Sequence, residues 1–161
     1  MSAPLTFADS IHVEADPASV YAVVSDVTRT GEWSPTCQEC WWDEGQGPRA
    51  GAWFTGRNVV PEREWTTRSQ VVVADPGAAF GWSVGPGRVV WTYRMEPSGD
   101  GTLLTESWEF TPEGQAYIAE RFGEHAEAQI RARTAAARAD IPATLAALKR
   151  IIEEGRRYAT R

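Results

Sequence analysis

The chain has 161 residues, of which 42% are hydrophobic and 24% charged, and its formal net charge at pH 7 is -6. This length fits one domain over residues 1–161, which buries roughly 70% of the surface of its unfolded chain. The acidic balance argues against a nucleic-acid partner, because phosphate binding requires clustered Lys and Arg. Residues Met1–Thr6 contain neither a basic start nor an apolar run; they predict a cytoplasmic protein without a secretory signal or membrane insertion.

The first predicted elements are a strand at about residues 6–15 and a helix at residues 17–27. Asp16 can cap this helix with its side chain, and Pro17 suits the first helical position. A second, broken helical turn that carries Trp33 is expected next, because a glycine and a proline interrupt it.

The next segment contains both cysteines of the chain, Cys37 and Cys40. We expect this segment to be a strand, on which residues three apart point to opposite faces. That geometry disfavours a disulfide and a shared metal ion, so the sequence predicts two reduced structural thiols. His12 and His125 have no ligand-like spacing, and neither a metal site nor a cofactor is expected.

Turn signals then occur at short intervals, at residues 45–48, 61–63, 75–77, 85–87 and 98–101. Six strand-like runs lie around these five turns, which is the pattern of an antiparallel meander. All eight tryptophans of the chain lie between Trp33 and Trp108, within or next to this region. One face of each strand is therefore apolar and bulky.

The C-terminal part of the chain is predicted to be helical. Thr111 can cap a helix that starts at Pro112. Apolar residues recur at helical spacing from Ile118 onwards, so the tail is either one long amphipathic helix or two helices joined near Pro142. We expect its apolar stripe to pack against the sheet.

Four segments carry a resemblance to a known family: Ile11–Val27, Glu32–Pro35, Gly51–Asn58 and Gly101–Trp108. They resemble the START-like (SRPBCC) superfamily, which includes bacterial polyketide cyclase/dehydrase and lipid-transport proteins and has the pollen-allergen-like fold. The resemblance implies an α+β helix-grip fold: a seven-stranded curved antiparallel sheet wrapped around a long C-terminal helix, with two short helices after the first strand. It also implies a cavity between sheet and helix that holds a hydrophobic molecule.

Strand parity predicts which side chains line such a cavity. Alternation places Trp91 and Tyr93 on one face of their strand, and Glu106 and Trp108 on one face of the next. The parity of residues 53–60 is ambiguous, because both sets contain a bulky residue, and we choose the set with Phe54 facing inward. The predicted ligand-binding residues are Phe54, Asn58, Trp82, Trp91, Tyr93, Glu106 and Trp108.

Glu106 is the one ionisable residue in this set with a carboxyl group. A carboxyl group on an apolar face must be paired, hydrogen-bonded or protonated, and its desolvation raises the pKa. Those conditions suit an acid/base catalyst or a group that binds a ligand hydroxyl. The alternatives are an ion pair with a neighbouring Arg or a position near the rim of the sheet, where water reaches the carboxyl.

The favoured function is binding, for transport or sequestration, of a small hydrophobic ligand without a cofactor. One alternative is a cofactor-free polyketide cyclase/dehydratase-like enzyme, in which Glu106 or Asn58 transfers protons or orients the substrate. The other is a protein-interaction module of the same fold, as in the activators of heat-shock chaperone ATPases. No nucleophile constellation and no phosphate-binding loop is present in the sequence. The protein is expected to be a monomer or a homodimer.

Overall fold

The computed structural model describes residues 2–45 and 47–159, so Gln46 in the first predicted turn lies outside the described residues. Its seven strands are β1 (Leu5–Val13), β2 (Cys37–Trp42), β3 (Trp53–Val60), β4 (Arg63–Asp75), β5 (Ala79–Val84), β6 (Val89–Ser98) and β7 (Gly101–Phe110). Its helices are α1 (Pro17–Val24), α2 (Pro112–Phe122) and α3 (Ala126–Ala159), with short 3₁₀ turns η1 (Val27–Glu32) and η2 (Gly123–His125).

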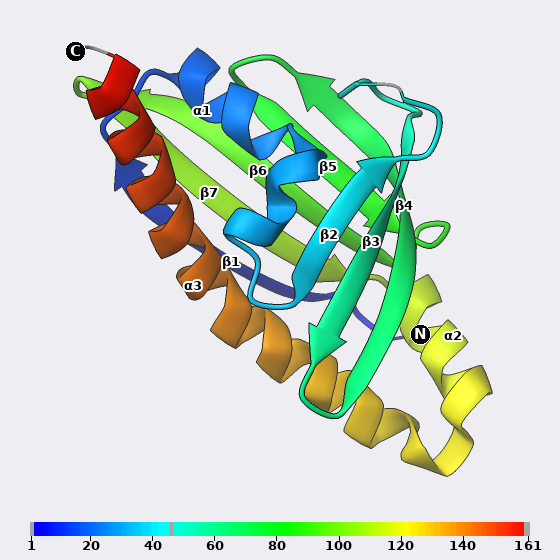
Figure 1. Ribbon diagram of the computed structural model, residues 1–161. Helices are drawn as coiled ribbons and strands as arrows, with labels where there is room; N and C mark the ends of the chain where they lie inside the picture. The colour runs from blue at the N-terminus through cyan, green and yellow to red at the C-terminus, as the bar shows by residue number, and fades with distance from the viewer. Residues whose placement is uncertain (1, 46, 160–161) are drawn as a thin grey trace.

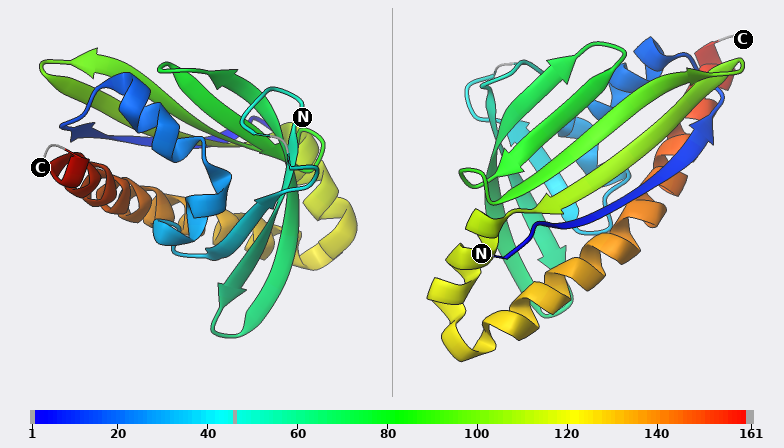
Figure 2. Two further views of the ribbon diagram at one scale, coloured as in Figure 1. Left: turned by 45° about the horizontal axis from the view of Figure 1, so that its top comes forward. Right: turned by 180° about the vertical axis from the view of Figure 1, so that it is seen from behind.

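The strands form one antiparallel sheet in the order β1-β7-β6-β5-β4-β3-β2. Strands β2 to β7 pair in sequence order, and β1 pairs with β7 at the far edge. The sheet curves strongly, and α1, η1 and α3 lie along its inner side (Figures 1 and 2). The predicted helix-grip fold is confirmed.

Two predicted helix caps are present in the structure. The Asp16 carboxylate accepts a hydrogen bond from the Ser19 N–H at 3.1 Å, and Thr111 Oγ1 accepts one from the Gly114 N–H at 2.9 Å. Each bond satisfies a backbone donor that the first turn of a helix leaves without an intrahelical partner. The first helix is shorter than predicted, since α1 ends at Val24 and a separate 3₁₀ turn comes after it.

Of the two alternatives for the tail, the helix junction near Pro142 is wrong, because Pro142 lies inside the long helix α3. The tail breaks instead at Gly123, whose φ of 52° suits a residue without a Cβ. A proline inside a helix removes one backbone hydrogen bond. Ile141, Leu145 and Leu148 are fully buried around this position. Burial of that apolar stripe holds the helix together on both sides of the proline.

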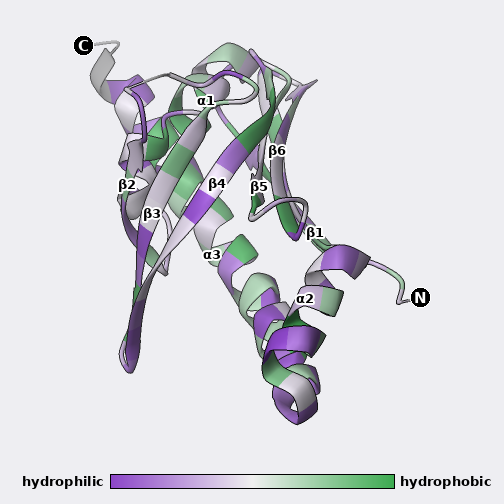
Figure 3. Cartoon of the chain, turned by 90° about the vertical axis from the view of Figure 1, so that its right-hand side faces the viewer, coloured by the Kyte–Doolittle hydropathy of each residue, from purple (hydrophilic) through white to green (hydrophobic). Residues whose placement is uncertain are grey.

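The long β3–β4 hairpin extends beyond the part of the sheet that α3 covers, and its tip is hydrophilic (Figure 3). Apolar residues concentrate where the strands face the helices. Among the described residues, no helix combines the length and apolar character needed to cross a bilayer.

Candidate ligand cavity

A cavity of about 670 Å³ lies between the concave face of the sheet and α3. Its walls come from β2 to β7, from η1 and the segment after it, and from one face of α3. Small-molecule sites in proteins are typically concave, mostly apolar and of about 300–1,000 Å³. This cavity therefore has the size and shape of a small-molecule site.

Aromatic side chains form the centre of the wall. Trp82, Trp91 and Trp108 lie opposite one another on β5, β6 and β7, because the strand register pairs them directly. The rings of Trp82 and Trp91 are stacked, with centroids 6.5 Å apart and planes at 15°. Trp82 also contacts the rings of Phe54, Phe80 and Tyr93 at 5.8 to 6.0 Å. The result is a continuous aromatic surface that faces the cavity.

All seven residues chosen from strand parity lie on the cavity wall: Phe54, Asn58, Trp82, Trp91, Tyr93, Glu106 and Trp108. The buried set of β3 is the one with Phe54 and Asn58. The Asn58 amide already donates to Thr67 Oγ1 at 3.1 Å and to the Trp65 carbonyl oxygen at 3.4 Å. That these seven residues contact a ligand stays a prediction.

Glu106 is only 3% exposed and belongs to a chain of hydrogen bonds that starts at Trp33. The Trp33 indole donates to the Tyr93 hydroxyl, and Tyr93, which lies directly opposite Glu106 on β6, donates to the Glu106 carboxyl group. No ion pair joins Glu106 to an arginine within the described residues. The Arg-paired and rim-exposed alternatives are therefore wrong for Glu106.

Burial raises the pKa of Glu106 to about 8, against the hydrogen bond from Tyr93, which lowers it, and with a smaller contribution from the Asp140 carboxyl. The pKa of Asp140 is itself raised by burial, and Thr36 donates to its carboxylate at 3.4 Å. The pKa of Tyr93 lies well above its ordinary value, chiefly because the side chain is desolvated. At neutral pH the cavity thus holds a protonated carboxyl group beside a phenol.

Sequence reasoning missed the polar residues that α3 contributes to the wall, above all Asp140 and Arg133. Asp140 comes four residues after Ala136 and four before Thr144, so all three share a helix face with the cavity-lining alanines. A polar residue on an otherwise small and apolar helix face is the signal that the sequence offers for Asp140. The sequence gives no comparable sign that Trp33 is a partner of Tyr93.

The prediction that Cys37 and Cys40 point to opposite faces is wrong. The register of β2 against β3 shifts between Cys37 and Glu39, so the strand has a bulge at Gln38. A bulge adds one residue and reverses the parity of the later part of the strand. Cys37 now lies opposite Asn58 and Cys40 opposite Gly56, and both cysteines line the cavity. Both are free thiols, and the Cys37 Sγ lies 3.3 Å from the Glu39 carbonyl oxygen.

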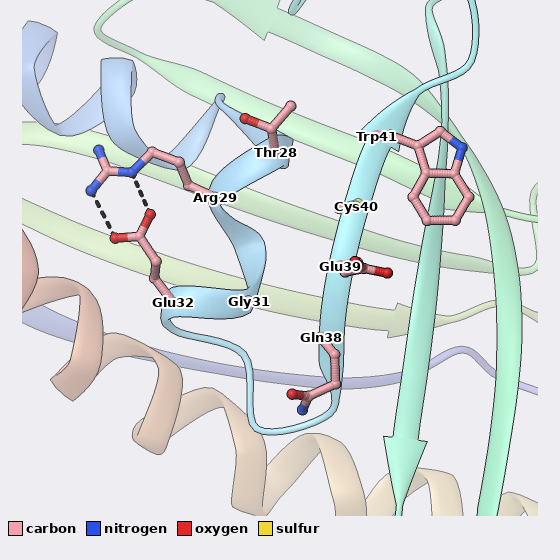
Figure 4. Close-up of a pocket in the computed structure, with 8 residues that line it drawn as sticks. All are labelled: Thr28, Arg29, Gly31, Glu32, Gln38, Glu39, Cys40 and Trp41. Carbon is pink, nitrogen blue, oxygen red and sulfur yellow. Dashed lines mark hydrogen bonds and ion pairs between the residues drawn. The ribbon is translucent and has the colours of Figure 1, made fainter.

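No group of three or more His, Cys, Asp or Glu side chains that could hold a metal ion occurs within the described residues. A second concavity, an open groove of about 490 Å³, lies between η1 and β2 (Figure 4). Its arginine is already engaged, since Arg29 pairs with Glu32 at 2.7 Å, and the Trp41 indole points away from η1. This groove therefore offers a ligand fewer free polar groups and less aromatic surface than the cavity does.

Comparison with known proteins gave one family and several similar structures. The model of the polyketide cyclase/dehydrase and lipid transport family matches residues 4–153. A polyketide-cyclase-like protein from Corynebacterium glutamicum, solved by NMR, shares 57% sequence identity over 95% of this chain and 94% of its own, with a TM-score of 0.71. No curated protein matches the chain.

Two more distant structures share the fold. The di-domain aromatase/cyclase StfQ of the steffimycin biosynthetic pathway is 18% identical, covers 94% of this chain with 51% of its own, and has a TM-score of 0.71. Major latex-like protein 151 from Panax ginseng is 13% identical over 68% of this chain and 80% of its own, with a TM-score of 0.57. At these identities the likeness concerns the fold alone.

Proposed function

The chain belongs to the polyketide cyclase/dehydrase and lipid transport family, and we propose that it binds a small hydrophobic ligand in the cavity between the sheet and α3. The observation that carries this proposal is the cavity itself, about 670 Å³ in volume and walled by the aromatic surface around Trp82. Aromatic walls bind flat or acyl ligands through apolar burial and ring stacking. The hydrogen-bonding end at Glu106 and Tyr93 suits a ligand that also carries a hydroxyl or carbonyl group.

A second candidate function is catalysis of proton transfer on a bound polyketide-like substrate. The specific observation in its favour is the buried pair of Tyr93 and Glu106, with a Glu106 pKa of about 8. A carboxyl group that is protonated at neutral pH can serve as a general acid. Asn58 fits a catalytic role less well, because its amide is already bonded to Thr67 and to the backbone of β4. The third candidate, a protein-interaction module, is not supported, since it requires a filled cavity.

Blocking the cavity tests the binding proposal. Ala136 and its neighbour Ala135 are both exposed residues of α3, but only Ala136 lines the cavity. We expect Ala136→Trp to weaken binding of anilinonaphthalenesulfonate, a hydrophobic aromatic probe, by roughly tenfold or more, because the new indole occupies the ligand volume. Isothermal titration calorimetry measures the affinity.

The matched control is Ala135→Trp, which adds the same indole one position away on the outer side of the helix. We expect it to leave the affinity for the probe unchanged. Equal affinities in the wild type and both variants, with the fold intact by circular dichroism, would place the bound probe outside the cavity and contradict the proposal.

A further inference from the structure

Two thiols are built into one wall of the cavity. The bulge at Gln38 turns Cys37 and Cys40 to the same face of β2, opposite Asn58 and Gly56. A Cβ atom on Gly56 would lie 3.1 Å from the Cys37 Sγ and 3.7 Å from the Cys40 Sγ, so both sulfurs sit over the same residue. Because glycine has no Cβ, this position leaves space for the two sulfur atoms. The two thiols are close enough for each to shift the pKa of the other.

The two sulfurs are not equivalent. Cys40 is buried, whereas Cys37 is half-buried and reaches the cavity. The hydrogen bond from the Cys40 thiol lowers the pKa of Cys37, and the Glu39 backbone and the charge of Arg57 act in the same direction, against partial burial. The same hydrogen bond, together with burial, raises the pKa of Cys40. Cys37 is therefore the more exposed and the more readily ionised thiol of the pair.

The walls around the thiols select the compounds that can reach them. Cys37 shares the cavity with Phe54, Trp82 and the other aromatic side chains of the sheet. We propose that Cys37 is a covalent attachment site for hydrophobic α,β-unsaturated carbonyl compounds that enter the cavity, with Cys40 as a positioning residue. This inference rests on the proposed function in one respect, namely that such a compound binds in the cavity before it reacts.

The reaction is a conjugate addition that needs no oxidant or cofactor. The Cys37 thiol releases its proton to water, and the thiolate attacks the β-carbon of the unsaturated carbonyl compound, forming a carbon–sulfur bond. The π electrons of the carbon–carbon double bond move to give an enolate, and the α-carbon of the enolate takes a proton from water. The net change adds sulfur and hydrogen across the double bond, and the product is a thioether. Cys40 holds the thiolate through its hydrogen bond and is not consumed.

The test uses benzylideneacetone, an aromatic enone, and its saturated analogue benzylacetone, which has a similar size but cannot be attacked. We expect intact-mass spectrometry to show one added enone per chain, with peptide mapping to Cys37. The rate should saturate with enone concentration and fall in the presence of benzylacetone. Cys37→Ser should form no adduct, and Cys40→Ala should still form it at Cys37 but roughly tenfold more slowly, since one charge-assisted hydrogen bond is lost.

Displacement of anilinonaphthalenesulfonate by benzylacetone, measured on the same sample, separates this inference from the proposed function. If benzylacetone displaces the probe but Cys37 gains no enone, the attachment site is refuted and the binding cavity stands. An adduct on Cys40, loss of both thiols as a disulfide without a mass gain, or a rate linear in enone and unaffected by benzylacetone also refutes it. Circular dichroism shows that each variant is folded.

Discussion

Replacing Glu106 by Gln is expected to raise the free energy of unfolding by about 4 to 5 kcal/mol at about pH 9 and to leave it nearly unchanged at about pH 4. The pKa of Glu106 is about 8 in the folded protein, above the ordinary value of 4.5 that it regains on unfolding. Between these values the folded state holds a proton that the unfolded state has released. The stability that protonated Glu106 contributes is therefore fully present below the unfolded pKa and is lost as the pH rises through the folded pKa.

Gln removes this loss because it has no proton to release, and its side-chain oxygen can still accept the hydrogen bond from Tyr93. Chemical denaturation over the pH range gives the two free energies. The matched control is Glu109→Gln on the same strand, because Glu109 is exposed on the outer face of the sheet. We expect it to shift stability by no more than about 0.5 kcal/mol at any pH. The free energy of unfolding of Glu106→Gln still depends weakly on pH, since burial also raises the pKa of Asp140. Identical profiles for wild type and Glu106→Gln would contradict the assignment of a protonated Glu106.

The same variant separates the two candidate functions once a ligand is known. A carrier keeps its affinity in Glu106→Gln and shows no turnover in either form. An enzyme that uses Glu106 as a general acid keeps its affinity but loses a factor of roughly 10² to 10⁴ in rate.

Replacing Trp82 by Ala is expected to lower the free energy of unfolding by about 2 to 4 kcal/mol and to weaken probe binding roughly tenfold. Trp82 contacts four other aromatic rings and lines the cavity, so its removal deletes both packing and ligand-facing surface. Urea denaturation and calorimetric titration measure the two effects.

Trp41→Ala is the control for the loss of an indole as such. Trp41 is 43% exposed and does not line the cavity. We expect it to change stability by less than about 1 kcal/mol and to leave the affinity unchanged. Equal losses of stability in both variants would show that Trp82 is not part of a packed aromatic wall.

Alternation along the strands is sufficient to predict the aromatic centre of the cavity wall. Residues such as Trp91 and Trp108 face inward because each sits on the bulky side of a regular strand, and regular strands preserve parity. The two helix caps are predictable for a similar reason, since Asp16 and Thr111 act on their own neighbours. Both the strand alternation and the helix caps depend on residues that are close together in the sequence.

The features that could not be predicted depend on contacts between distant segments. The bulge that brings Cys37 and Cys40 together appears only in the register between β2 and β3. The bond between Tyr93 and Glu106 likewise depends on which residues of β6 and β7 face each other. Pro142 suggests a helix break by local rules, but burial against the sheet outweighs its missing hydrogen bond.

The measurement that tests the binding cavity most directly is an NMR titration that follows the indole N–H signals of the eight tryptophans. Five of them line the cavity, namely Trp33, Trp65, Trp82, Trp91 and Trp108, and Trp41, Trp42 and Trp53 do not. With anilinonaphthalenesulfonate or benzylacetone as ligand, we expect saturable shifts in the first group, largest for Trp82, Trp91 and Trp108, while the second group stays in place. The absence of saturable shifts in a folded protein, or shifts confined to Trp41, Trp42 and Trp53, would contradict the binding cavity.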